Sequence, residues 1–158
     1  MAQTWKKGRG KLGVLDPLIG DWRAEEADPK RPQGYCERRF ERVLGGNYVQ
    51  LSAKWVFSYG GKENVYQETA LFGPGEGGGL AFWSFTSDGK RSQGQSAAAP
   101  DVAPDPICFE AQMPQGLARM VYWPAEDEGF HFAVESKTKK GWNRFLNHHY
   151  RPAGASRA

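Results

Sequence analysis

Residues 107–150, ICFEAQMPQGLARMVYWPAEDEGFHFAVESKTKKGWNRFLNHHY, decide the fold. Four runs rich in β-branched and aromatic residues follow one another here, separated by short turn segments at 114–116, 124–129 and 138–141. Runs of this length and composition are typical of β-strands. Because the connections are too short to contain a helical crossover, consecutive strands must pair antiparallel.

The same pattern extends back from residue 107 to residue 20. Four Gly-rich turn segments divide this part of the chain, at 45–47, 59–64, 73–79 and 87–90. Residues 48–58 alternate between apolar and mostly polar side chains, as a half-buried strand does. The expected strands are 20–26, 35–44, 48–58, 65–72, 80–86, 91–99, 107–113, 116–123, 129–137 and 141–150.

About ten short strands joined by hairpins predict an all-β fold, an up-and-down antiparallel barrel that is closed or nearly closed. A sandwich of two sheets is the alternative. A barrel of ten strands is wider than one that its own side chains fill, so it should contain a cavity. Before the first strand we expect one short helical turn, with Asp16 as its N-cap and Pro17 at its first position.

The chain of 158 residues with a formal net charge of +3 suits one domain. We expect a flexible basic tail at 1–13, the barrel at 14–152 and a disordered tail at 153–158. The basic residues of the first tail are spaced by glycines and form no concentrated stripe, so no nucleic-acid partner is expected. No apolar run approaches the roughly 20 residues of a membrane span, and no secretory segment is visible. A cytoplasmic protein without a membrane partner is therefore expected.

Cys36 and Cys108 are isolated, without the CxxC spacing of a zinc site. Buried free thiols are expected rather than a disulfide. No Ser/His/Asp or Cys/His signature stands out, so the sequence predicts neither catalytic residues nor a bound metal.

A short apolar turn followed by Gly20-Asp21-Trp22 opens the first strand, and an aromatic, basic strand ends the chain. This combination resembles the calycin group. Within it, 18–22 (LIGDW), 43–50 (VLGGNYVQ), 68–73 (ETALFG) and 141–152 (GWNRFLNHHYRP) resemble bacterial lipocalin-like barrels of unknown function. The resemblance implies that Trp22 closes one end of the barrel, with Arg144 or Arg151 as a cation–π partner.

Two better understood relatives differ from this chain at their functional motifs. Fatty-acid-binding proteins hold a carboxylate through Arg-x-Tyr on the last strand, where this chain has His149-Tyr150-Arg151. Nitrobindin-like haem barrels continue Gly-x-Trp with x-Gly-x-Gly and use a late histidine as iron ligand. This chain lacks those glycines at 23–26, but under a haem alternative His148 would be the ligand.

The three histidines are placed by strand alternation. His148 and His149 are adjacent, so they face opposite sides of the sheet. His148 shares the more apolar face with Trp142 and Tyr150, so we expect it inside, as a ligand contact or as a wall residue. His131 lies between two phenylalanines and is expected outside.

Residues 35–44 carry charges on both faces, with Arg38 on the face of Phe40 and Arg39 on the face of Glu37 and Glu41. An arginine inside a barrel can hold a carboxylate or phosphate by bidentate hydrogen bonds. Arg39 is the predicted contact and Arg38 the alternative. A solvated strand with cross-strand ion pairs is the competing interpretation.

Aromatic residues at alternating positions suit either a pocket for an apolar or planar ligand or a barrel filled by its own side chains. Residues 80–85 are apolar on both faces, so one face could be covered by a second copy, giving a homodimer, or by the N-terminal turn. The predicted ligand contacts are Trp55, Phe57, Phe82, Tyr122, Phe130, Phe132, Arg39, His148 and Tyr150.

These patterns favour a non-enzymatic protein that binds a small hydrophobic or amphipathic molecule in the barrel and needs no cofactor. A haem barrel that reacts with nitrogen or oxygen species through His148 is the second hypothesis. A filled barrel that acts as an interaction or structural protein is the third.

Overall fold

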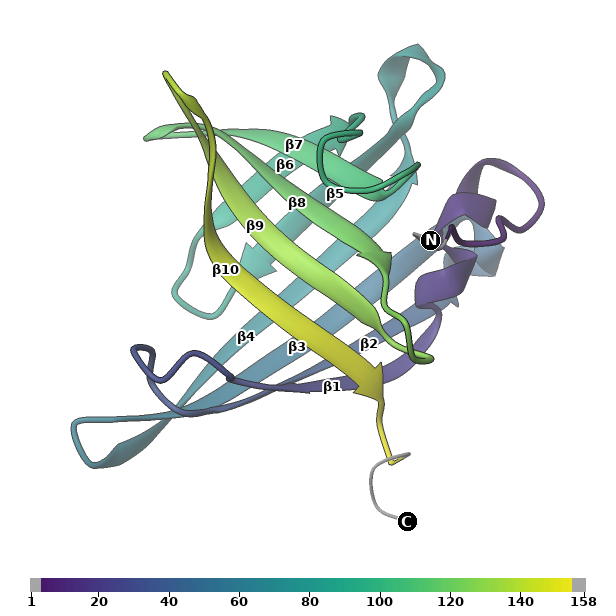
Figure 1. The fold of residues 1–158 in the computed structure, drawn as a ribbon. Coiled ribbons are helices and arrows are strands. Elements are labelled where there is room, and N and C mark those ends of the chain that lie inside the picture. Colours follow the sequence, from purple (N-terminus) through teal and green to yellow (C-terminus); the bar gives the residue numbers. More distant parts are fainter. Residues whose placement is uncertain (1–3, 155–158) are drawn as a thin grey trace.

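The computed structural model describes residues 4–154, which form a closed barrel of ten antiparallel strands (Figure 1). Every strand pairs with its neighbours in the chain, and the first strand pairs with the last. This confirms the predicted all-β, up-and-down fold and its strand number. The strands are β1 (Gly20–Glu25), β2 (Gly34–Val43), β3 (Tyr48–Tyr59), β4 (Lys62–Pro74), β5 (Leu80–Thr86), β6 (Arg91–Ser96), β7 (Ile107–Met113), β8 (Gly116–Pro124), β9 (Phe130–Thr138) and β10 (Gly141–Pro152).

Three 3₁₀ helices accompany the strands: η1 (Lys11–Leu18), η2 (Leu44–Gly46) and η3 (Glu76–Gly78). No helix within residues 4–154 is long and apolar enough to cross a membrane.

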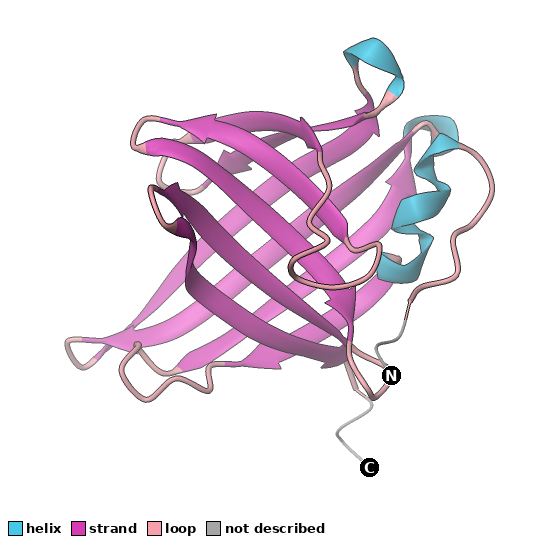
Figure 2. Ribbon diagram, turned by 45° about the horizontal axis from the view of Figure 1, so that its top comes forward, coloured by secondary structure: helices cyan, strands magenta, loops and turns pink. Residues whose placement is uncertain are grey.

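Helix η1 lies at one end of the barrel (Figure 2) and inserts Leu12, Leu15 and Leu18 into the core. A spacing of three residues puts all three leucines on one face of a 3₁₀ helix, which has three residues per turn. The helix therefore begins at Lys11, before the predicted turn. Asp16 does not cap it, since its Oδ1 accepts a hydrogen bond from Arg42 Nη2 at 2.8 Å.

The predicted boundaries of the barrel also shift at the N-terminus. Residues 11–13 belong to η1, and the Trp5 ring lies 6.3 Å from that of Phe130, so part of the predicted tail packs on the barrel. At the other end the Ala153 amide donates to the Asp21 carbonyl at 2.9 Å. Residues 1–3 and 155–158 of the two predicted tails lie outside the described part of the chain.

An aromatic cluster fills the half of the barrel next to η1. The Phe72 ring lies 5.1 Å from Phe109 and 6.1 Å from Phe82, and Phe40 lies 5.9 Å from Tyr122. Aromatic pairs at such distances add to the stability that burial of their apolar surface gives. The packed half forms a floor, and the other half of the barrel remains hollow.

Two ladders of the barrel are much shorter than the others. Strands β1 and β10 are in register only at Trp22–Pro152 and Arg23–Arg151. Strands β6 and β7 are in register only at residues 95–96 and 109–110. Next to this second ladder, a Cβ on Gly94 would lie 2.0 Å from the Glu110 carbonyl oxygen, so only glycine permits the close approach of β7.

The segment between β6 and β7 covers the outer faces of β7 and β8. Its Ala99 packs with Cys108 and Val121, and its Asp101 accepts a hydrogen bond at 2.6 Å from Arg119. Cys108 and Cys36 are both free and buried, as predicted. Burial raises the pKa of the Cys108 thiol to about 12, so this thiol is unreactive at neutral pH.

The run at 80–86 is apolar on both faces, as the sequence showed. Phe82 points into the barrel, whereas Trp83 is half-buried and Phe85 is 54% exposed on the outer face. Helix η1 lies at the end of the barrel and leaves Phe85 uncovered. Burial of this face by a second copy stays a prediction.

Candidate functional site

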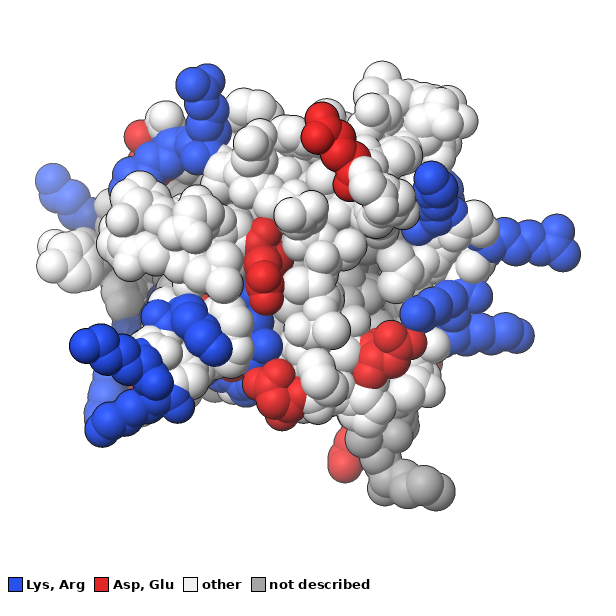
Figure 3. Space-filling model, turned by 90° about the horizontal axis from the view of Figure 1, so that it is seen from above, with Lys and Arg blue, Asp and Glu red and all other residues white. Residues whose placement is uncertain are grey.

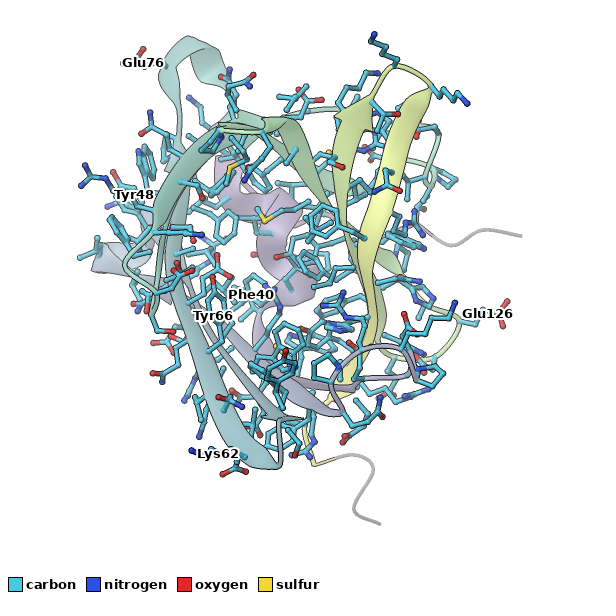
Figure 4. The ribbon with its side chains drawn as sticks, turned by 90° about the vertical axis from the view of Figure 1, so that its left-hand side faces the viewer. Phe40, Tyr48, Lys62, Tyr66, Glu76 and Glu126 are labelled. Carbon is cyan, nitrogen blue, oxygen red and sulfur yellow. The ribbon has the colours of Figure 1, made fainter. Side chains whose placement is uncertain are left out.

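The hollow half of the barrel contains a cavity of about 630 Å³. Figure 4 shows the barrel from the open end, with η1 behind the interior and Phe40 and Tyr66 pointing inward. Strands from every part of the sheet contribute to the walls, because the alternating residues of a closed barrel point to its interior. A barrel wholly filled by its own side chains would have no such space.

Arg38 lies at the floor of the cavity. Its guanidinium donates from Nε to the Tyr150 hydroxyl at 2.9 Å and from Nη1 to the Tyr122 hydroxyl at 3.1 Å. The same group lies 4.2 Å from the centre of the Phe132 ring, a cation–π contact. Only 8% of Arg38 is exposed, and within residues 4–154 no carboxylate lies within 4.0 Å of it. A buried arginine without a paired carboxylate is unusual, because burying an unpaired charge is costly.

The two tyrosines are neutral partners for this charge. Burial raises the pKa of Tyr122 to about 12 and raises that of Tyr150 well above its usual value. A neutral hydroxyl that accepts from Arg38 keeps its own proton and can donate it to a further acceptor. In addition, Arg38 Nη2 forms no hydrogen bond with any residue in 4–154. The floor can therefore present donors from Arg38 and from the Tyr150 hydroxyl to an anionic group.

His148 lies in the wall, as predicted, and its Nε2 is 3.3 Å from Glu26 Oε1. Glu26 is buried and also accepts a hydrogen bond from Arg31 Nε at 2.8 Å. Burial lowers the pKa of His148, although Glu26 opposes this shift, so the imidazole is neutral at pH 7. Since Nε2 faces Glu26, the arrangement does not fit iron ligation through that atom.

Trp55 supplies an unused donor to the wall. Its indole Nε1 is buried and is the one such side-chain atom without a hydrogen-bond partner in residues 4–154. The ring lies 6.1 Å from that of His148, and the Arg31 guanidinium lies 5.4 Å from its centre. An unsatisfied buried donor in a cavity wall can bind an acceptor on a molecule that enters the cavity.

Five of the predicted contacts line the cavity: Trp55, Phe82, Phe132, His148 and Tyr150. Tyr122 lies beneath them and reaches the site through its hydrogen bond with Arg38. Two predicted contacts lie elsewhere. Phe130 packs at the closed end, 4.8 Å from Trp22, and Phe57 packs on Trp55 at 5.0 Å.

Arg39 does not face the cavity. Its side chain is 62% exposed on the outer face of β2, where Nε lies 2.9 Å from Glu41 and 3.6 Å from Asp21. The inward residues of β2 are those in phase with the buried Phe40, and Arg38 is among them. The arginine of the site is therefore Arg38, the alternative in the sequence prediction.

Trp22 lies at the closed end, where its Nε1 donates to the Leu18 carbonyl at 2.7 Å. Its predicted partner Arg144 is not there, because it pairs with Glu135 at 2.8 Å and lies 5.1 Å from the Trp123 ring. Strand β1 meets β10 only around residue 151, and Arg144 lies about 23 Å before that point at about 3.3 Å per residue. Arg151 pairs instead with Asp127 at 3.2 Å. Neither predicted arginine forms a cation–π contact with Trp22, and the Phe130 ring packs against it instead.

His131 and His149 face each other across strands on the outside, with ring centres 4.7 Å apart. His149 Nε2 lies 3.1 Å from an oxygen of Asp127. No group of three or more His, Cys, Asp or Glu residues within 4–154 is arranged to hold a metal ion.

Basic side chains surround the entrance of the cavity. Lys90, Arg91 and Lys137 line its rim. Figure 3 shows Lys and Arg side chains at both ends of the barrel, including the left-hand end, which is the open end. Such a rim attracts anions, because exposed charges act over the Debye length of the solution.

One cavity residue that the sequence reasoning missed is Glu68, on the inward face of β4. Its face also carries Tyr66, Ala70 and Phe72, so the alternation of this strand was a usable signal.

No family model matches the chain, and a comparison with curated proteins finds no similar sequence.

Proposed function

We propose that this protein binds a small amphipathic molecule with an anionic group in the barrel cavity, and that it does so without catalysis. The observation that carries the proposal is Arg38, a buried guanidinium at the cavity floor with tyrosine hydroxyls but no carboxylate as its partners. A ligand carboxylate would give Arg38 a directly paired counter-charge, which Glu68 does not provide because it acts on Arg38 only at longer range.

The rest of the cavity suits the remainder of such a ligand. Its volume of about 630 Å³ is within the usual range of small-molecule sites. Aromatic and aliphatic side chains cover most of the walls and would exclude water from an apolar body. A closed barrel of ten strands is also compatible with the calycin-like fold that the sequence resembles. Because of this barrel and the sequence resemblance, we propose that the chain is a lipocalin-like member of the calycin group.

The test is binding of dodecanoate, measured by displacement of the fluorescent anion 1-anilinonaphthalene-8-sulfonate from the protein. We expect Arg38→Met to weaken dodecanoate binding at least about tenfold, because a charge-assisted hydrogen-bond contact is lost. Arg39→Met is the matched control, since it removes the same charge from the outer face of the same strand. Equal affinities for the two variants, or no binding to the wild type, would contradict the proposal.

A further inference from the structure

Polar and apolar side chains both line the cavity. Strands β2, β4 and β5 contribute polar side chains: Arg38, Glu68, Ser84 and Thr86. Strands β7, β8, β9 and β10 contribute the apolar Met113, Met120, Val134 and Leu146, together with the polar Ser136, His148 and Tyr150. A ligand that fills the space is therefore in contact with both polar and apolar side chains.

Arg38 and Glu68 lie in one row across β2, β3 and β4. Arg38 is in register with Ala53 on β3, and Ala53 is in register with Glu68 on β4. Two strand spacings separate their Cα atoms by about 9.6 Å. Ala53 between them carries only a methyl group, and the two charged groups form no salt bridge. The row thus presents a positive and a negative group with open space between them.

Glu68 has an acceptor in the cavity that is not used by the protein. Its Oε2 accepts the hydrogen bond of the Ser84 hydroxyl. Its Oε1 has no hydrogen-bond partner within residues 4–154. An apolar ligand body against Glu68 would displace water from this oxygen without replacing its hydrogen bond, which is unfavourable.

We propose that the ligand is a hydroxylated amphipathic carboxylate, with its carboxylate on Arg38 and a hydroxyl group that donates to Glu68. The apolar body of the ligand contacts the apolar side chains of the cavity, among them Met120, Val134 and Leu146. Glu68 is then the specificity-determining residue that favours a hydroxylated acid over a plain fatty acid, which binds more weakly. This inference rests on the proposed function, since it assumes that the cavity binds an amphipathic anion.

The experiment compares two acids of equal length, octadecanoate and 10-hydroxyoctadecanoate, by displacement of the same fluorescent anion. The wild type should bind the hydroxy acid about tenfold more tightly, the effect of one hydrogen bond to a charged group. Glu68→Leu should abolish this preference and bind octadecanoate at least as well as the wild type, which also shows that the variant folds. Gln67→Leu, a change on the exposed face of the same strand, should retain the preference.

The outcomes separate this inference from the proposed function. If both acids bind the wild type equally, the role of Glu68 is refuted while binding of an amphipathic anion stands. A preference that survives in Glu68→Leu also refutes it, because the hydroxyl contact must then lie elsewhere. If neither acid binds the wild type, the proposed function and this inference both fail.

Discussion

Trp22 connects η1 to the sheet: it donates a hydrogen bond to the Leu18 carbonyl and packs on the Phe130 ring. Trp22→Phe should keep most of the packing against Phe130 and lose the bond to the Leu18 carbonyl, at a cost of about 1 kcal/mol in the free energy of unfolding. Trp22→Ala should lose both and cost about 2 to 3 kcal/mol. Urea denaturation followed by circular dichroism measures both values. A Trp22→Ala variant as stable as the wild type would show that this residue does not hold η1 in place.

His148 should make the stability of the protein depend on pH. Burial lowers its pKa in the folded state, and the positive charges of Arg38 and Arg31 lower it further. Glu26 acts in the opposite direction and raises this pKa. The unfolded chain therefore binds more protons than the folded chain as pH falls below the unfolded value of about 6.5. The free energy of unfolding should fall through this window and stop falling below the folded pKa.

The variant His148→Gln removes this titration while it keeps a polar side chain opposite Glu26. Urea denaturation between pH 7.5 and pH 5 should show a shallower loss of stability in the variant than in the wild type. Equal pH profiles would assign the loss to other groups, such as His131, whose pKa is also lowered by burial.

At the level of single residues, alternation predicted much but not all of the site. It separated Arg38 from Arg39 and His148 from His149 correctly, because adjacent residues of a strand must face opposite sides. It did not show which face of 35–44 is inside, since charges stand on both. Phe40 was the available signal, as a large apolar residue that shares its face with Arg38. The partner of Trp22 depended on the register of distant strands, which no local pattern contains.

Among the elements, the connection between β1 and β2 is fixed to the barrel by Arg31. This side chain bonds Glu26 at 2.8 Å and the Phe145 carbonyl at 3.0 Å, and so joins the connection to β10. Arg31→Ala should release residues 26–33, raising their amide hydrogen-exchange rates and the dissociation rate of dodecanoate at least about tenfold. Lys30→Ala is the control, because Lys30 is exposed and has no salt bridge with any residue in 4–154. Unchanged exchange in Arg31→Ala would show that the connection is held by other contacts.

The elements that were predicted well are those with Gly-rich or Pro-containing turns at both ends. Such turns place strand ends within a few residues, as they did for β3, β5 and β8. The helical segment was predicted as a single turn that starts at Asp16, whereas η1 begins at Lys11 and has eight residues. Its leucines at 12, 15 and 18 repeat every three residues, a period that belongs neither to an α-helix nor to a strand.

For the whole molecule, the basic rim should accelerate the capture of anions. Raising the ionic strength from about 0.02 M to about 0.3 M shortens the Debye length and should reduce the association rate of dodecanoate severalfold. Replacing Lys90, Arg91 and Lys137 with glutamine should remove most of this salt dependence with little effect on dissociation. The same three-charge change at Lys7, Arg9 and Lys11, next to the closed end, is the control. Equal salt dependence in both variants would contradict steering by the rim.

The two short ladders, β1–β10 and β6–β7, have a mechanical consequence. They divide the ring into a shell of six strands, β1–β6, and a shell of four strands, β7–β10. Residues of both shells line the cavity, so a bound molecule contacts both of them. Opening should follow these two seams, since fewer backbone hydrogen bonds must break there than at any other ladder. A ligand that contacts both shells would then hold them together. Its binding should slow amide hydrogen exchange along the two short ladders more than along the long β3–β4 ladder.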